Sequence, residues 1–490
     1  MDEPHRDHDA VREGLTCAPV HVDGLDPWVF MVWLLPAISA LLSLLQTGDL
    51  AFQIRAGEWM LDHGAILRHD IFTFTAYGRP WLNLQWSAEG ALGGLYRAVG
   101  WRGLVVVRAL LVATAAGVTF RRTCRAGANA AVAAGLVLAT MYAAFTLPGT
   151  FALRPQLFAV LLFLLAAWLL DGRKERPERL LWLIPIGVVW ANVHGSFPLL
   201  TVLLVIAASA DAAGGRRRGA AWTGALALAS GATPLLSPWG TGTYRYVANI
   251  MLPPAVRYVS DEWKPLWQRI PAAWVFLVVV GVLTVICLRR RARRPTMEET
   301  LTLVFFTGLA LWYGRNLVWW ALVTPPVVGG LLSSWNPKRT RVRRADRLVA
   351  GLLGGLFLIG LLRVATVQPV EGLLAETAPS GLTSAVRATT RDGARVFDGW
   401  WGAWFEIAIP DVPSFIDARA EIFSDEVWAD YLRVIFAKPG WSDVLDRWDI
   451  GEVVASKGEA TLVRALSADP GWTLFYEDDE GVVFVRAAAM

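Results

Sequence analysis

The sequence predicts a polytopic α-helical membrane protein with about 11 transmembrane helices and a small C-terminal α/β domain. Apolar runs of about 20 residues, the length that crosses a bilayer, recur between residues 28 and 365. Charged residues make up 18% of the chain and its mean hydropathy is +0.42. A soluble globular protein carries about 25% charged residues. These two observations exclude a single soluble domain.

The net charge of +4 conceals a division along the chain. Residues 366–490 contain 21 acidic and 10 basic residues, a net charge of −11, so the remainder carries +15. Because the charge is divided in this way, the sequence pI near 9.0 does not indicate nucleic-acid binding. It indicates basic loops on one side of a membrane and an acidic domain elsewhere.

We expect the chain to cross the membrane first at residues 28–45. The other expected spans are 103–120, 127–145, 155–170, 180–192, 197–213, 220–236, 272–288, 300–312, 317–335 and 348–365. Every strongly basic connection follows an even-numbered span, namely 121–125, 173–179, 216–218, 289–294 and 338–347. The positive-inside rule places these connections in the cytoplasm. In the cell (inner) membrane, residues 1–27 are then cytoplasmic and residues 366–490 lie outside.

Residues 84–100 are apolar enough to suggest another span, but they include Gln85, Glu89 and Arg97. If this segment crossed, the later basic loops would face outward while the N-terminus stayed inside. We therefore expect a helix that lies at the outer interface, or one that dips into the membrane and returns.

The first outer loop, residues 48–83, carries two candidate catalytic carboxylates. Asp49 stands where the first span emerges, and a carboxylate at membrane depth tends to mark function. Its structural alternative is to cap the helix expected at 50–62, which Gly64 would end. Gln53 falls on the same helical face as Asp49. Asp70 is the second candidate, and its alternative is an Asx-type turn.

Later outer loops add further polar groups at the apolar boundary. With Trp86 and Gln53, the candidate substrate-binding residues are Arg154, Asn192, His194, Glu262, Trp263, Arg315 and Asn316. An arginine at such a boundary can also merely snorkel. Arginine forks suit phosphate, tryptophan faces suit sugar rings, and a carboxylate beside a hydroxyl can act as a general base. Gathered in one outward cavity, these types would suit sugar transfer from a lipid phosphate, or the movement of an anionic lipid.

A series of short motifs resembles bacterial membrane proteins of the GT-C glycosyltransferase superfamily. These are relatives of the protein O-mannosyltransferases and the lipid A aminoarabinose transferases, in an uncharacterised branch. The motifs are Gly48-Asp49, Ile54, Gly57-Glu58, Gly64, Asp70 to Thr75, Gly78, Pro80-Trp81, Gln85-Trp86, Arg154-Pro155-Gln156, Trp190 to Gly195, Pro238-Trp239-Gly240, Glu262-Trp263, Arg315-Asn316 and Phe415 to Arg419.

The resemblance implies a polyprenyl-phosphate sugar donor and a glycan, lipid or protein acceptor on the outer side, with inversion at the anomeric carbon. It maps the acceptor-side carboxylate onto Asp49, with Asp70 as a second candidate, and the phosphate-binding arginine onto Arg154 or Arg315. The chain departs from its relatives at Gln53, where many carry His. The first loop has no Asp-x-Asp pair, so we assign no metal ligand, and a divalent cofactor is neither indicated nor excluded.

Residues 366–490 lack a spanning run and read as a small α/β domain. We expect strands at 394–397, 414–416, 451–455 and 481–485, and helices at 424–436 and 441–448. Asp398 and Asp417 follow strands, where open α/β sheets often place ligands. Ordinary turn chemistry is the alternative for both.

The sequence therefore predicts a glycosyltransferase that uses a lipid-linked sugar. Two other functions stay open. A lipid or polysaccharide transporter would place polar groups across the bilayer midplane, where the spans are mostly apolar except at Arg108. A non-catalytic membrane subunit that presents the outer domain would leave Asp49, Asp70, Arg154 and Arg315 out of contact.

Overall fold

The structure is a computed structural model that describes residues 27–251, 263–335, 343–375, 378–390 and 394–487. Its contacts divide the chain into two compact units. The first unit comprises Met1–Ser39, Val112–Thr150 and Lys264–Ile359, and the second comprises Ala40–Leu111, Phe151–Trp263 and Gly360–Met490. The expected first outer loop and the C-terminal residues therefore belong to the same unit.

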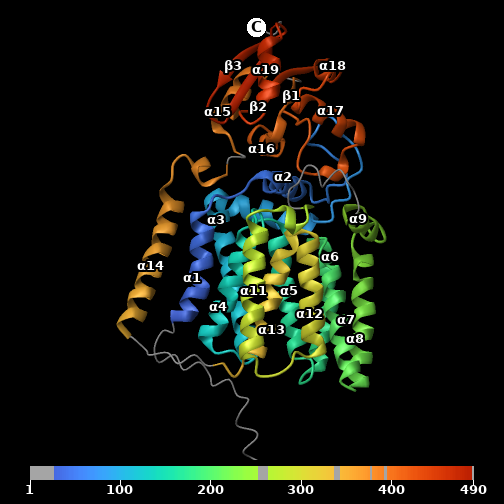
Figure 1. Ribbon diagram of the computed structural model, residues 1–490. Helices are drawn as coiled ribbons and strands as arrows, with labels where there is room; N and C mark the ends of the chain where they lie inside the picture. The colour runs from blue at the N-terminus through green and yellow to red at the C-terminus, as the bar shows by residue number, and fades with distance from the viewer. Residues whose placement is uncertain (1–26, 252–262, 336–342, 376–377, 391–393, 488–490) are drawn as a thin grey trace, which may run out of the picture. The chain divides into compact units, whose positions relative to one another are not determined.

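Each expected span coincides with a helix. These helices are α1 Pro27–Leu42, α3 Trp86–Arg125, α4 Ala130–Phe145, α5 Pro155–Asp171, α6 Leu183–Val193, α7 Pro198–Ala213, α8 Arg217–Ala232, α11 Ala272–Arg290, α12 Met297–Trp312, α13 Leu317–Leu331 and α14 Arg343–Thr366 (Figure 1). Within the described ranges, α3, α11 and α14 are the three helices long and apolar enough to cross a membrane. Helices α1, α4, α5 and α7 are apolar but shorter. The number of spans stays a prediction.

The long helix α3 is two helices joined at a kink. Gly100 has a φ of 59° and a ψ of −170°, which interrupts the helical geometry. A positive φ of this kind costs a glycine little, because it has no Cβ. The break falls at the end of the expected interfacial helix 84–100, so the segment before Gly100 has its own axis.

In the first unit, α4 packs against α11 and α13, and α12 packs against α13. Thr140 donates a hydrogen bond of 3.1 Å from its Oγ1 to the backbone oxygen of Ala321, which joins α4 to α13. A Cβ on Gly329 would lie 2.6 Å from the side chain of Thr123. Because the residue at 329 is glycine, α13 can approach the end of α3 this closely.

In the second unit, α5 packs against α6 and α7, and α7 packs against α8. A buried ion pair joins the ends of α5 and α7, with Arg173 Nη2 at 3.1 Å from Asp211 Oδ1. Arg216, just before α8, also contacts Asp211. The unit further contains α9 Gly242–Met251 and the short 3₁₀ helices η1 Pro177–Trp182, η2 Thr233–Leu236, η6 Val370–Leu373, η7 Gly399–Trp401 and η8 Ala420–Ile422.

Helix α2, Gly48–His63, forms the start of the first loop and ends at Gly64, whose φ of 59° is left-handed. This confirms the predicted helix and its C-cap. Helix α2 lies against the first part of α3 with backbone in contact with backbone. A Cβ on Gly57 would lie only 1.9 Å from the backbone oxygen of Glu89, and one on Gly93 would lie 2.6 Å from the nitrogen of Glu58. The pair of glycines permits this crossing.

Residues 394–487 form a four-stranded sheet with helices around it. The strands are β1 Arg395–Phe397, β2 Ile450–Ser456, β3 Trp472–Glu477 and β4 Gly481–Arg486, in the order β1-β2-β4-β3. Strands β1 and β2 are parallel, and the other two pairings are antiparallel. The helices of the C-terminal segment are α15 Ser380–Thr389, α16 Gly402–Ala408, α17 Asp425–Ile435, α18 Trp441–Arg447 and α19 Ala460–Ala468 (Figure 1).

The first loop and the C-terminal segment share one hydrophobic core. Phe52, Phe72 and Trp81 of the loop are buried in the same cluster as Phe397 and Phe415. Apolar burial is the main favourable contribution to folding, so the loop depends on the C-terminal segment for its conformation.

One expected strand of the C-terminal segment is absent and one was missed. Residues 414–416 make a single bridge, Ser414 to Thr73 of the first loop, and form no strand of the sheet. The prediction of a strand there was wrong, because the partner is a loop segment that pairs at one position. Strand β3 was not predicted.

Candidate functional site

Asp49 forms an ion pair with Arg154. Asp49 is the second residue of α2, and Arg154 is the residue before Pro155 at the start of α5. Asp49 Oδ2 lies 3.0 Å from Arg154 Nη1, with 40% of the Asp49 side chain and 11% of the Arg154 side chain exposed. Thr47 occupies the N-cap of α2 and makes no side-chain capping bond. The carboxylate is therefore held by an arginine from a distant loop and stays accessible.

Gln53 lies one helical turn beyond Asp49 on α2. Only 3% of its surface is exposed. Its Oε1 has no hydrogen-bond partner in the part of the chain that the structure describes. A buried amide oxygen without a partner costs about 1–3 kcal/mol, so this atom is a place where a hydroxyl or water donor would stabilise the site.

Trp86 and Asn192, two further candidates, contact each other. The indole Nε1 of Trp86 donates to Asn192 Oδ1 at 2.8 Å, and Ser87 Oγ donates to the backbone oxygen of Asn192 at 2.6 Å. Asn192 also donates from Nδ2 to Val188 at 2.8 Å. These bonds fix the start of α3 against the end of α6.

His194 has local partners. Its Nδ1 lies 2.8 Å from Ser196 Oγ and accepts the backbone N–H of Ser196 at 3.1 Å. Trp190 Nε1 donates to the same hydroxyl at 3.0 Å. His194 therefore shapes the turn after α6.

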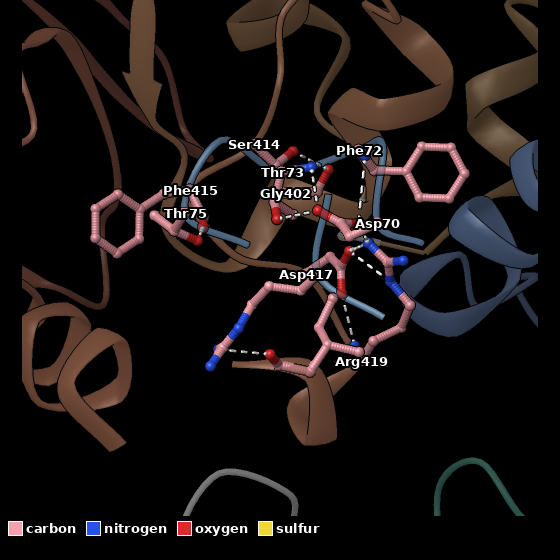
Figure 2. A network of polar contacts seen from close by, with 11 residues as sticks. Asp70, Phe72, Thr73, Thr75, Gly402, Ser414, Phe415, Asp417 and Arg419 are labelled. Atoms are coloured by element: carbon pink, nitrogen blue, oxygen red, sulfur yellow. Dashed lines mark hydrogen bonds and ion pairs between the residues drawn. The ribbon is translucent and has the colours of Figure 1, made fainter. Parts of the chain in front are cut away.

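Asp70 is buried, and its carboxylate is the centre of a polar network (Figure 2). It accepts backbone N–H bonds from Phe72 at 3.3 Å and Thr73 at 3.1 Å, and the Thr73 hydroxyl donates to it at 2.6 Å. This is the Asx-type turn of the structural alternative. An ion pair of 2.5 Å to Arg419 completes the shell around Asp70. A carboxylate occupied in this way fixes the loop. Of the two candidate catalytic carboxylates, Asp49 is the accessible one.

Arg419 joins the first loop to the C-terminal segment. Its Nε donates to Asp417 at 2.8 Å while its Nη2 reaches Asp70 (Figure 2). The guanidinium carbon lies 4.6 Å from the ring centroid of Trp81, 4.9 Å from that of Phe72 and 5.7 Å from that of Phe52. Aromatic faces attract a cation. Arg419 is thus a buried charge balanced by two carboxylates and three rings.

The charges of this cluster alter its pKa values. Burial by itself would lower the pKa of Arg419, but Asp417, Glu406 and Asp70 outweigh it and raise the pKa. Burial, followed by the charge of Asp417, raises the pKa of Glu406 well above its usual value. A raised pKa favours the neutral form of Glu406, which lessens its repulsion from the carboxylate of Asp417.

Asp398 follows β1 and is almost fully buried. Its Oδ1 accepts the backbone N–H of Phe415 at 3.2 Å. Burial raises the pKa of Asp398 to about 7. Both predicted strand-end carboxylates, Asp398 and Asp417, are thus hydrogen-bonded within the C-terminal segment.

The remaining candidates belong to other parts of the chain. Trp263 is half-buried in the second unit. Arg315 and Asn316 belong to the first unit, in the 3₁₀ helix η5 Gly314–Asn316, where Asn316 Nδ2 donates to Leu309 at 3.4 Å. Glu262 lies outside the described residues. The predicted gathering of all the outer loops into one cavity stays a prediction.

No group of three or more His, Cys, Asp or Glu residues that could hold a metal ion occurs within the described ranges.

The sequence did not identify Arg419 as a site residue. Its motif, Phe415 to Arg419, is visible in the sequence. The partner Asp70 lies 349 positions away, and neither residue's spacing or type indicates the pairing.

No protein-family model and no curated protein matches the chain. Several solved structures resemble it, among them two of an oligosaccharyltransferase from Archaeoglobus fulgidus. One is AglB in complex with an inhibitory peptide and a dolichol-phosphate. It matches with a TM-score of 0.50 and 11% sequence identity, and the match covers 94% of this chain and 74% of that one. The other is the apo form, with a TM-score of 0.50, 13% identity and the same coverage. The chain therefore has a GT-C-like fold, which it shares with this oligosaccharyltransferase.

Proposed function

We propose that the protein transfers a sugar, with inversion, from a polyprenyl-phosphate-linked donor to an acceptor hydroxyl at the outer face of the membrane. The observation that carries the proposal is the ion pair between Asp49 and Arg154, at 3.0 Å with an accessible carboxylate. The GT-C-like fold and the membrane-length helices support it.

The reaction is a single displacement. The acceptor hydroxyl oxygen attacks the anomeric carbon of the donor sugar. The bond between that carbon and the phosphate oxygen breaks, and the polyprenyl phosphate leaves. The hydroxyl proton passes to the carboxylate of Asp49, which acts as the general base. Attack on the face opposite the leaving group inverts the anomeric carbon.

Arg154 has two roles in this proposal. It holds the carboxylate of Asp49 in place through their ion pair. A guanidinium carries five N–H donors in a fork, so one arginine can hold a carboxylate and a phosphate oxygen together. The charge that develops on the leaving phosphate would then be stabilised beside the base.

The location of the site follows from the basic loops. Those loops assign the cytoplasmic side, and the connection that carries Asp49 lies on the other side. The shared core of Phe52, Phe72 and Phe415 supports placing the C-terminal segment on the same side as the first loop. Membrane lipid and the donor lipid are the expected partners.

The contact between Asp49 and Arg154 favours an enzyme over a non-catalytic subunit. A subunit that only presents a C-terminal domain needs no accessible carboxylate held by an arginine 105 positions away. Transport would not require an accessible base either.

Turnover by the purified protein tests the proposal. The protein in lipid nanodiscs would receive a panel of polyprenyl-phosphate sugars, and release of polyprenyl phosphate would be measured by mass spectrometry. Asp49→Asn keeps the shape of the side chain and should lower the rate about 10²- to 10⁴-fold, the usual contribution of a general base.

Asp62→Asn is the matched control, because Asp62 is an exposed carboxylate of the same helix that pairs with Arg97. Full activity of Asp49→Asn would remove the assigned role of Asp49. Equal losses in both variants would show that any change of charge on α2 is harmful and would equally contradict it.

A further inference from the structure

A cleft of about 240 Å³ lies within the second unit. Neither Asp49 nor Arg154 lines it. It is bounded by the kinked part of α3, by η6, by the start of α15 and by α16. None of the predicted site residues lines it. Pockets that enclose drug-sized ligands measure about 300–1,000 Å³, so this cleft suits one small ring.

One wall of the cleft is aromatic. The rings of Tyr96 and Trp101 are 5.0 Å apart, and those of Trp101 and Trp404 are 6.1 Å apart. Trp404 is fixed in place, since its Nε1 donates to Thr383 Oγ1 at 2.9 Å. Packed aromatic side chains with a polar tip offer a rigid surface that is apolar on the body and hydrogen-bonding at the edge.

Helix α15 and η6 contribute hydroxyls and one charge of each sign to the lining. Ser380 and Ser384 are exposed on α15. Arg387 lies one turn beyond Ser384 and donates from Nη2 to the backbone oxygen of Ala408 at 2.7 Å. Glu371 of η6 also lines the cleft. The two formal charges cancel, so the lining favours a neutral ligand over a phosphate.

We infer that this cleft binds a single neutral sugar ring through its hydroxyl-bearing and aromatic side chains. A sugar offers many hydroxyls to serine, arginine and carboxylate groups and C–H surfaces to rings, whereas a lipid tail offers no hydrogen bonds. The further assignment, that the ring belongs to a glycan acceptor, rests on the proposed function. Helix α16 lines the cleft and also packs against α2, the helix that begins beside Asp49.

Binding of free sugars tests the inference directly. The full chain in detergent would be titrated with neutral methyl glycosides of glucose, mannose, galactose and N-acetylglucosamine, with saturation-transfer NMR as the readout. Weak affinity is expected, with a Kd of about 1 mM. At least one glycoside should bind, and Asp49→Asn should bind it as the wild type does.

Ser384→Trp fills the cleft and should weaken binding about tenfold or more. Ser467→Trp is the matched control, because Ser467 is exposed on α19 and bonds the carbonyl one turn before it, as Ser384 does. Unchanged unfolding midpoints would show that both variants fold.

The outcomes separate the cleft from the reaction. Absence of binding by every glycoside, or equal binding by Ser384→Trp and the wild type, would overturn the cleft even if donor turnover succeeds. Preferred binding of inorganic phosphate or of a neutral serine-containing peptide, lost in Ser384→Trp, would overturn the sugar assignment. Glycoside binding lost in Ser384→Trp, together with no turnover of any donor, would support the sugar cleft and overturn its assignment to an acceptor.

Discussion

Replacing Arg419 by methionine should release the first loop from the C-terminal segment. Methionine fills a similar volume and keeps contact with the rings of Phe72 and Trp81, but it removes the positive charge. Asp70 and Asp417 would then face each other without a counter-charge, with 0% of either side chain exposed. The variant therefore tests the electrostatic part of the network rather than its packing.

The size of the effect follows from burial. Removing one partner of a buried ion pair costs about 3–5 kcal/mol, because the remaining charge stays desolvated. That corresponds to an increase of about 10²- to 10⁴-fold in the equilibrium constant for opening. The control Lys457→Met breaks an exposed pair with Glu477, in which 42% and 54% of the side chains are exposed. Such a pair contributes at most about 1 kcal/mol.

Hydrogen–deuterium exchange in detergent would measure the effect locally. Peptides that cover residues 70–81 and 414–423 should exchange much faster in Arg419→Met than in Lys457→Met. Adding Asp70→Asn and Asp417→Asn should restore much of the protection, because it removes the stranded charges. Equal exchange in Arg419→Met and Lys457→Met would refute the reasoning, since the network would then contribute no stability.

Two further predictions concern packing and pH. Gly57→Ala should destabilise the second unit by about 1–3 kcal/mol, because its Cβ would lie 1.9 Å from the backbone oxygen of Glu89. Gly90→Ala is the control, since a Cβ there meets nothing within 4 Å. Equal unfolding midpoints for the two variants would contradict the close crossing of α2 and α3. Burial raises the pKa of Glu459 from 4.5 to about 7, so the folded state holds a proton that the unfolded state releases. Stability should therefore fall as pH rises from about 4.5 to about 7, by about 3 kcal/mol for this group. Denaturant unfolding at pH 5 and pH 8 gives the change in the free energy of unfolding between these pH values. Glu459→Gln should remove the contribution of Glu459 to that change, and an unaltered change would contradict the raised pKa of Glu459.

The helices were predictable because their signal is local. A run of apolar residues of bilayer length identifies a helix without reference to any partner, and every expected span coincides with one. The end of α2 at Gly64 and the break near Gly100 were also readable, since both depend on a glycine and its neighbours.

The contacts between distant segments were not predictable from the sequence. The pairing of Asp70 with Arg419, and of Thr73 with Ser414, depends on how the chain returns after several helices. Strand β3 was missed because its residues alternate poorly, and its register against β4 shifts between Leu474 and Tyr476. The strand-like run at 414–416 pairs instead with the first loop.

The candidate site was predictable by residue type rather than by geometry. The sequence predicts Asp49 as a base and Arg154 as a phosphate ligand, and the structure brings them together. The sequence predicts Asp70 as a second base for the same reason, but its carboxylate is enclosed by Thr73 and Arg419. A sequence shows which carboxylates a loop carries, whereas their exposure in the structure decides which of them can meet a substrate.

Exchanging the two charges of the Asp49–Arg154 pair tests the central claim most directly. The double variant Asp49→Arg with Arg154→Asp keeps an ion pair at the same place, so its unfolding midpoint should approach that of the wild type. It removes the carboxylate from α2, however, so we expect sugar transfer to stay about 10²- to 10⁴-fold below the wild-type rate. Recovery of the wild-type transfer rate in the double variant would contradict the account, because the pair would then serve only to hold the fold together.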